Sequence, residues 1–172
     1  MGLIGVIWGL GGFLLLLASA MYRLTPLAVS AFREPLGAVH YAALAVWVAF
    51  MVYSEAYRGF HRAFAPRFGA RLRHLYQHPE LGLVVLAPFY GMGLLHATRK
   101  RKLVAWSVTL GIIVLIVLVR HLVQPWRGIV DVGVVLGLML GSLSVIYFTI
   151  RAFSDRSFSF ATDVPDRGRT NS

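Results

Sequence analysis

Residues 128–150 read GIVDVGVVLGLMLGSLSVIYFTI, an apolar stretch in which Asp131 is the single charged side chain. About 20 such residues cross the hydrocarbon core of a bilayer as one α-helix, because each residue adds about 1.5 Å of length. Three further stretches of similar length and character occupy residues 3–22, 37–57 and 103–123. The sequence therefore predicts an all-α, polytopic membrane helix bundle.

The overall composition supports this class of protein. Of the 172 residues, 58% are hydrophobic and only 14% are charged, whereas soluble domains average about 45–50% apolar and about 25% charged residues. So few charges could not cover the surface of a soluble domain. Cysteine is absent, which excludes disulfide bonds, thiolate metal ligands and cysteine nucleophiles.

A fifth apolar stretch, 81–98, is shorter and contains Pro88 together with three glycines, Gly82, Gly91 and Gly93. Proline and glycine weaken a helix, and in lipid every backbone polar group needs a partner inside the protein. We expect this stretch to be either a kinked fifth span or a re-entrant hairpin. The bundle then has four or five transmembrane segments.

The basic residues of the loops predict the orientation, because the cytoplasmic loops of membrane proteins are rich in lysine and arginine. With five spans these residues divide seven against eight between the two sides, and with a re-entrant 81–98 they divide eleven against four. Both versions place the basic cluster 99–102 and the C-terminus in the cytoplasm. The sequence thus predicts a multi-pass protein of a bacterial-type inner membrane.

Residues 58–78 combine apolar and basic side chains at helical spacing. The apolar positions recur every three or four residues, at Phe60, Phe64, Phe68, Leu72 and Leu75. Four arginines fill the gaps between them, namely Arg62, Arg67, Arg71 and Arg73. This pattern predicts an interfacial amphipathic helix, with its rings in the acyl region and its lipid-facing arginines on anionic head groups. With the spans it forms one transmembrane domain, 1–150, which a polar tail, 151–172, follows.

Glycines recur at helical spacing in the first and last spans. The last span contains Gly133, Gly137 and Gly141, and the first places Gly5, Gly9 and Gly12 on one face. Small residues at this spacing let two helix backbones approach closely, which drives helix association in lipid. These faces predict either an interface with another subunit, such as a second copy of the chain, or the packing of the first span on the last.

Two acidic residues stand inside predicted spans, and an ionisable group in a membrane is a candidate for function. Asp131 lies one turn into the last span, four residues after Arg127. Glu55 lies near the end of the second span, three residues before Arg58. One interpretation is a local ion pair within each helix. The alternative is a transport site to which both acids contribute.

Two pairs of histidines are candidate ligands. His40 and His96 fall near the same membrane face if the bundle has five spans, as the axial ligands of a b-type haem would. His74 and His78 are spaced i, i+4, which places both imidazoles on one helix face for a metal ion. The arginines beside this second pair would repel a cation, and we expect neither a metal nor another cofactor.

The formal net charge of +10 is assigned to cytoplasmic loops and anionic lipid rather than to nucleic acid. Sequence motifs of serine hydrolases, P-loop enzymes and zinc proteases are not found,. The leading interpretation is a non-enzymatic accessory or structural subunit of a membrane assembly. The alternatives are a small transporter or channel with a broken-helix cavity at 81–98, and an electron-transfer protein with a b-type haem.

Overall fold

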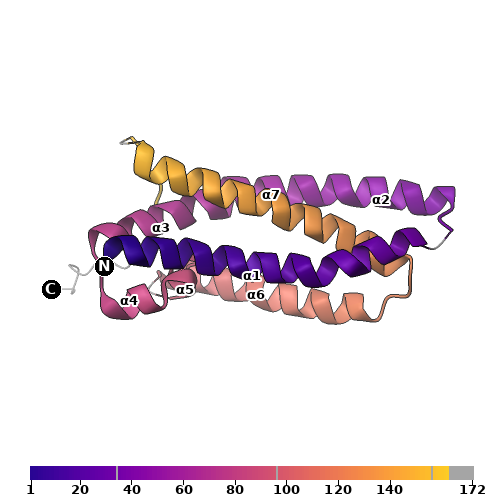
Figure 1. The fold of residues 1–172 in the computed structure, drawn as a ribbon, viewed down its shortest axis with the longest axis horizontal. Coiled ribbons are helices and arrows are strands. Elements are labelled where there is room, and N and C mark those ends of the chain that lie inside the picture. The colour runs from indigo at the N-terminus through magenta and orange to yellow at the C-terminus, as the bar shows by residue number, and fades with distance from the viewer. Residues whose placement is uncertain (34, 96, 156, 163–172) are drawn as a thin grey trace.

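The computed structural model of the chain describes residues 1–33, 35–95, 97–155 and 157–162. Within these ranges all regular secondary structure is helical. Four helices are long and apolar enough to cross a membrane, and they lie lengthwise beside one another (Figure 1). The all-α fold and its apolar helices are as predicted from the sequence.

The first two long helical segments run antiparallel to each other. α1 (Gly2–Ser30) extends from the N-terminus to the opposite end of the bundle, where the 3-10 turn η1 (Ala31–Arg33) follows it. The return path is one continuous helical segment made of α2 (Ala38–Met51), the π-helix η2 (Val52–Phe64) and α3 (Ala65–Gln77). As Figure 1 shows, this path brings α3 back beside the start of α1.

Residues 81–95 do not form a fifth long helix. They contain α4 (Leu81–Val85) and α5 (Ala87–Gly91), of five residues each. Both pack against the first half of α1, where the indole Nε1 of Trp8 donates to the Val85 carbonyl oxygen at 2.9 Å. Gly93 adopts a φ of 78° in the turn that follows α5, a conformation that favours glycine. Of the two alternatives, this arrangement corresponds to the hairpin, because the chain enters and leaves residues 81–95 at the same end of the bundle (Figure 1). We call residues 81–95 the re-entrant segment.

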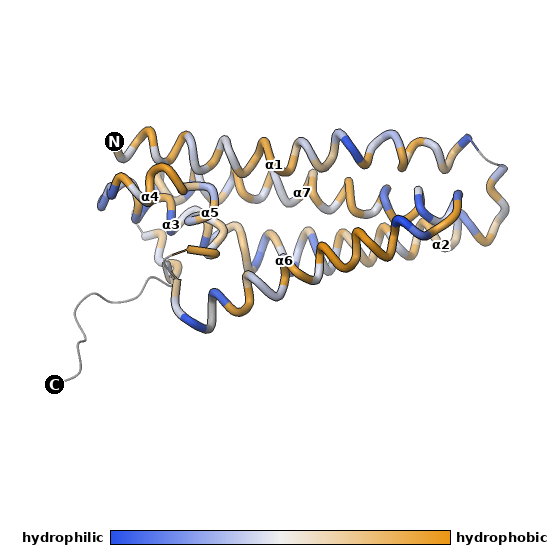
Figure 2. The backbone as a smooth tube through the Cα atoms, turned by 90° about the horizontal axis from the view of Figure 1, so that it is seen from below, coloured by the Kyte–Doolittle hydropathy of each residue, from blue (hydrophilic) through white to orange (hydrophobic). Residues whose placement is uncertain are grey.

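Two further long helices, α6 and α7, complete the bundle. α6 (Arg99–Arg120) runs to the opposite end, and α7 (Trp126–Ser154) returns. Three segments that together carry eight of the 17 basic residues meet at one end, which we call the basic end: α3, the start of α6 and the end of α7. The opposite end is called the far end. In Figure 2, α6 begins with hydrophilic residues and is largely hydrophobic beyond them.

The core lies between α1, α3 and α7. The ring of Phe13 on α1 lies 4.9 Å from that of Phe68 on α3, and Phe68, Leu72 and Leu75 are fully buried. The predicted interfacial helix over 58–78 is therefore wrong, since its apolar stripe packs on protein within a segment continuous with α2. An i, i+3, i+4 stripe can be buried against protein as well as against lipid. The pattern alone does not distinguish the two.

α6 is the least buried of the four long helices, and the helix over 38–77 comes next, with 6% of its most apolar window buried. No residue in the most apolar window of α6 is buried, whereas 39% of the corresponding window of α7 is buried. A Cβ atom built on Gly111 would meet nothing within 4 Å. α6 thus exposes apolar side chains around most of its circumference.

Candidate functional site

Arg71 on α3 is the largest fully buried side chain of the described residues, with 1% of its surface exposed. Its three nitrogens each donate to a backbone carbonyl: Nε to Tyr90 at 2.6 Å, Nη2 to Leu95 at 2.7 Å and Nη1 to Thr162 at 2.8 Å. The guanidinium carbon also lies 4.4 Å from the centre of the Tyr90 ring, within range of a cation–π contact. One side chain thus holds α3, the re-entrant segment and the C-terminal segment together.

The prediction that Arg71 faces lipid is wrong. Arg71 follows Phe68 by three residues and precedes Leu75 by four, so helical geometry places it on the apolar stripe itself. That spacing is the sequence signal of its burial. The other three arginines of the predicted lipid-facing set are exposed or partly buried, namely Arg62, Arg67 and Arg73.

A polar cluster of His74, His78 and Tyr90 lies beside Arg71. The Tyr90 hydroxyl is 3.1 Å from Nδ1 of His74, and the two imidazole rings are 4.9 Å apart. Burial raises the pKa of Tyr90, although the charge of Arg71 acts in the opposite direction. Among the described residues no group of three or more histidines or acids could hold a metal ion, and two imidazoles alone supply half of a usual zinc ligand set.

A cleft of about 270 Å³ opens next to this cluster, and we call it the α3 cleft. Its polar wall, on one face of α3, carries Arg73, His74 and Gln77, and its other wall, on the C-terminal segment, carries Phe158, Phe160 and Thr162. Sequence reasoning missed Tyr90 and the C-terminal wall. Arg71 and Thr162 are 91 positions apart, and no periodic pattern links such distant residues.

The C-terminal segment reaches the cleft because the chain turns sharply after α7. The Asp155 carboxylate accepts hydrogen bonds from the Ser157 hydroxyl at 2.6 Å and from the Ser157 N–H at 2.9 Å. These bonds are the main reason why the pKa of Asp155 lies below its usual range. The Asp155 carbonyl oxygen accepts from Nη1 of Arg73 at 3.3 Å, so the turn is also fixed to α3.

The glycines of α7 contact the α2–η2 segment of the same chain. A Cβ atom on Gly133 would lie 2.5 Å from Nε1 of Trp47, one on Gly137 would lie 2.9 Å from Oε2 of Glu55, and one on Gly141 would lie 2.6 Å from the ring of Phe60. Between the last two contacts the partner residue advances by five positions while α7 advances by four. The i→i+5 hydrogen bonds of a π-helix account for this extra residue.

The glycines of α1 contact a different set of elements. A Cβ atom on Gly9 would lie 2.8 Å from Cδ2 of Leu72, and one on Gly12 would lie 2.6 Å from Cγ of Pro88. Gly5 likewise lies against α3 and α4. The two glycine faces are thus used within the chain. α1 packs on α7, as the intrachain alternative predicted, but the glycines of the two faces contact other elements. Helix spacing identifies a close-packing face without identifying its partner.

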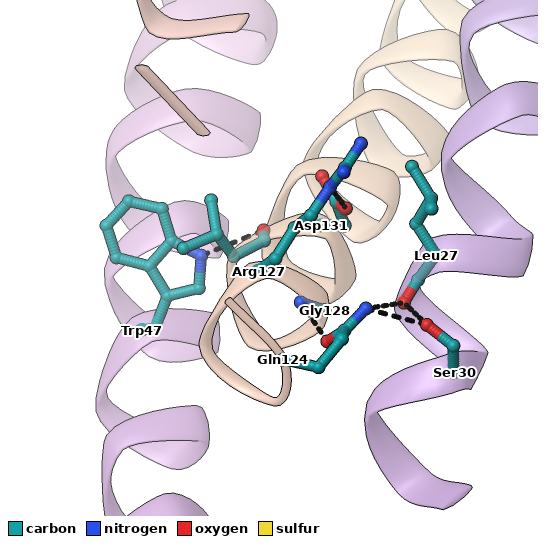
Figure 3. Close-up of polar contacts among 8 residues, drawn as sticks. Leu27, Ser30, Trp47, Gln124, Arg127, Gly128 and Asp131 are labelled. Carbon is teal, nitrogen blue, oxygen red and sulfur yellow. Dashed lines mark hydrogen bonds and ion pairs between the residues drawn. The ribbon is translucent and has the colours of Figure 1, made fainter. Parts of the chain in front are cut away.

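A second polar group lies at the far end, between α7 and its neighbours (Figure 3). Nε1 of Trp47 donates to the Val130 carbonyl oxygen at 3.1 Å. Nε2 of Gln124 donates to the Ser30 hydroxyl at 2.7 Å, and Oε1 of Gln124 accepts from the Gly128 N–H at 3.1 Å. These contacts fix the start of α7 to both α1 and α2.

The two acids of the predicted spans have different surroundings. Asp131 is 3% exposed, and its Oδ2 lies 3.9 Å from Nε of Arg127, so an ion pair forms within α7. Glu55 packs on Gly137 instead, and the described interactions include no ion pair between Glu55 and Arg58. Asp131 precedes Gly137 by six residues, which is about 9 Å along the helix axis. The structure therefore does not bring Glu55 and Asp131 into contact with each other.

Of the two histidines proposed as haem ligands, the structure describes His40. Nδ1 of His40 accepts from the Gly37 N–H at 3.2 Å at the far end, where the His40 ring lies 5.0 Å from that of Trp126. His96 lies outside the described residues.

No protein-family model matches the chain, and comparisons with curated proteins and with solved structures found no significant match.

Proposed function

We propose that this protein is a non-enzymatic integral membrane protein that acts as an accessory or structural subunit of a membrane assembly. The observation that carries the proposal is where the polar side chains of the bundle direct their donors. Arg71 donates to three backbone carbonyls, and Trp8 and Trp47 donate to one each. Because lipid offers no water to a buried donor, these contacts fix helices and turns relative to one another. They support a rigid bundle rather than a reaction centre.

The proposal places a partner on α6. The glycine faces of α1 and α7 are occupied within the chain, whereas the apolar side chains of α6 are exposed around the helix. Lipid alone can cover such a helix at little cost, because acyl chains are as apolar as leucine. A protein partner would therefore be distinguished from lipid because it contacts only one side of α6.

Photo-crosslinking in the native membrane tests the proposal. A photoreactive residue is placed singly at two opposite sets of positions on α6: Val104, Val108 and Leu115, and Trp106, Leu110 and Val117. We expect one set to give a discrete protein adduct and the other to give lipid adducts only, with buried Val145 as the negative control. The detergent-corrected mass should exceed that of one chain. Lipid adducts at every position, together with a monomeric mass, would contradict the proposal.

We also infer that the basic end faces the cytoplasm of a bacterial-type inner membrane. The re-entrant arrangement is the one in which the basic residues divide eleven against four, which is a strong positive-inside bias. In this orientation both the N-terminus and the C-terminal segment lie on the cytoplasmic side. The basic residues of this end that are not buried then lie at the level of anionic head groups, where each contributes about 1 kcal/mol of attraction.

Cysteine labelling tests this orientation in a chain that has no cysteine of its own. Single replacements Tyr76→Cys, Lys100→Cys and Ser154→Cys should be protected from an impermeant reagent in intact cells and should react after lysis. Val123→Cys, in the exposed turn between α6 and α7, should react in intact cells. The reverse labelling pattern would invert the topology, and reaction of Tyr76→Cys alone would restore a fifth span.

A further inference from the structure

We propose that the α3 cleft is a binding site for a phosphate ester, and that its natural occupant is the phosphodiester of an anionic phospholipid. This inference goes beyond the proposed function and does not depend on it, because it concerns a small ligand of the basic end and not a protein partner. It rests on the donors of the cleft, on how they are held, and on its size.

The donors converge from one helical face. Arg73, His74 and Gln77 are separated by one and three residues, so all three project from the same side of α3, and all three line the cleft. The described contacts of Arg73 use one of its five N–H groups, in the bond to the Asp155 carbonyl oxygen,. A guanidinium fork matches the oxygens of a phosphate group in both charge and geometry. No acidic side chain is among the described residues that line the cleft.

The walls are held in place before any ligand binds. Nη1 of buried Arg71 donates to the Thr162 carbonyl oxygen, which positions the C-terminal wall. The Tyr90 hydroxyl lies against Nδ1 of His74, which orients the imidazole on the other wall. Held donors bind more tightly than mobile ones, because less side-chain freedom is lost on binding. The full charge of Arg71 also lies one hydrogen bond behind the C-terminal wall.

The volume of the α3 cleft and its apolar wall favour a small phosphate ester that also carries apolar groups. The cleft volume of about 270 Å³ is at the lower limit of the ~300–1,000 Å³ typical of sites for drug-sized ligands. It suits a head group rather than a nucleotide. Phe158 packs partly on the hydrophobic core while Phe160 is 44% exposed, which gives the cleft an apolar side for the carbon skeleton of the ester. A phospholipid at the basic end would present both a phosphate group and an adjoining carbon skeleton to the cleft.

Binding is measured on the full-length protein in a neutral detergent, with short-chain phosphatidylglycerol, glycerol phosphate and short-chain phosphatidylcholine as separate probes. We expect saturable 1:1 binding of phosphatidylglycerol that weakens about tenfold in Arg73→Gln, the loss expected for one charge-assisted hydrogen bond. The matched control is Arg62→Gln, which removes an equal charge from an exposed position on η2. It should change the affinity less than about twofold.

The outcomes separate the possible sources of the phosphate. Tighter binding of phosphatidylglycerol than of glycerol phosphate supports a lipid, and equal binding assigns the site to a soluble phosphate ester. Equal losses in Arg73→Gln and Arg62→Gln, or no saturable binding, would overturn the site. If Arg73→Gln does not fold, the affinity of Gln77→Leu is measured instead. Gln77 is exposed, so this variant should fold, and its amide lines the cleft. Unchanged affinity in Gln77→Leu would then reject the proposal.

Discussion

Replacing Arg71 by leucine is expected to lower the free energy of unfolding by about 3–5 kcal/mol. The change leaves the carbonyl oxygens of Tyr90, Leu95 and Thr162 without their donor, and each unsatisfied buried group costs about 1–3 kcal/mol. Water can reach the two partly buried carbonyls, which keeps the total below the full sum. The measurement is denaturant or thermal unfolding of the purified protein in detergent.

The same variant should release the C-terminal segment, because Nη1 of Arg71 is what fixes Thr162. Chymotrypsin should then cut after Phe158 or Phe160 at least several times faster than in the wild type. Arg71→Lys should not restore stability, since an ammonium group cannot reproduce the three-directional fork of a guanidinium. Arg62→Leu is the matched control, and it should change stability by less than about 0.5 kcal/mol because the side chain is exposed. Equal effects of the two leucine variants would show that the Arg71 contacts contribute nothing specific.

The long helices were predictable because lipid imposes one simple requirement on a span. About 20 apolar residues must follow one another. The stretches 3–22 and 128–150 lie within α1 and α7, and 103–123 matches α6 as far as Arg120, where that helix ends. The re-entrant segment was open to prediction only as an alternative. Pro88 and its neighbouring glycines indicate a broken helix, but they do not say whether the chain crosses the membrane.

The candidate site was less predictable, for a physical reason. A hydrophobic stripe reports that one helix face avoids water, and both lipid and protein satisfy that condition. Phe68 and Leu72 therefore predicted the correct apolar face of α3, but this face packs on protein and not on lipid. The acceptors of Arg71 are backbone carbonyls, which every residue carries, so nothing in the sequence marks Tyr90 or Leu95 as their source.

Gly133→Leu is expected to destabilise the bundle by about 2–4 kcal/mol, and more than Gly137→Leu does. At Gly133 a new side chain meets the rigid indole of Trp47. Displacing that indole also breaks the Nε1 bond to the Val130 carbonyl oxygen, which adds about 0.5–1.5 kcal/mol to the usual overpacking cost of about 1–3 kcal/mol. At Gly137 the neighbour is the flexible end of Glu55, which can move aside, and a loss of about 1–2 kcal/mol is expected.

Thermal unfolding in detergent, combined with the mass of the folded protein, tests this order. Met139→Leu is the control, because Met139 is 45% exposed and the exchange conserves volume, so its effect should stay within about 0.5 kcal/mol. Because Gly133 and Gly137 contact Trp47 and Glu55 of the same chain, both variants should lose stability while the mass of the folded species stays unchanged. A lower mass with unchanged melting would instead place these glycines between subunits. An order in which Gly137→Leu is the more harmful would show that the Trp47 contact is not the rigid one.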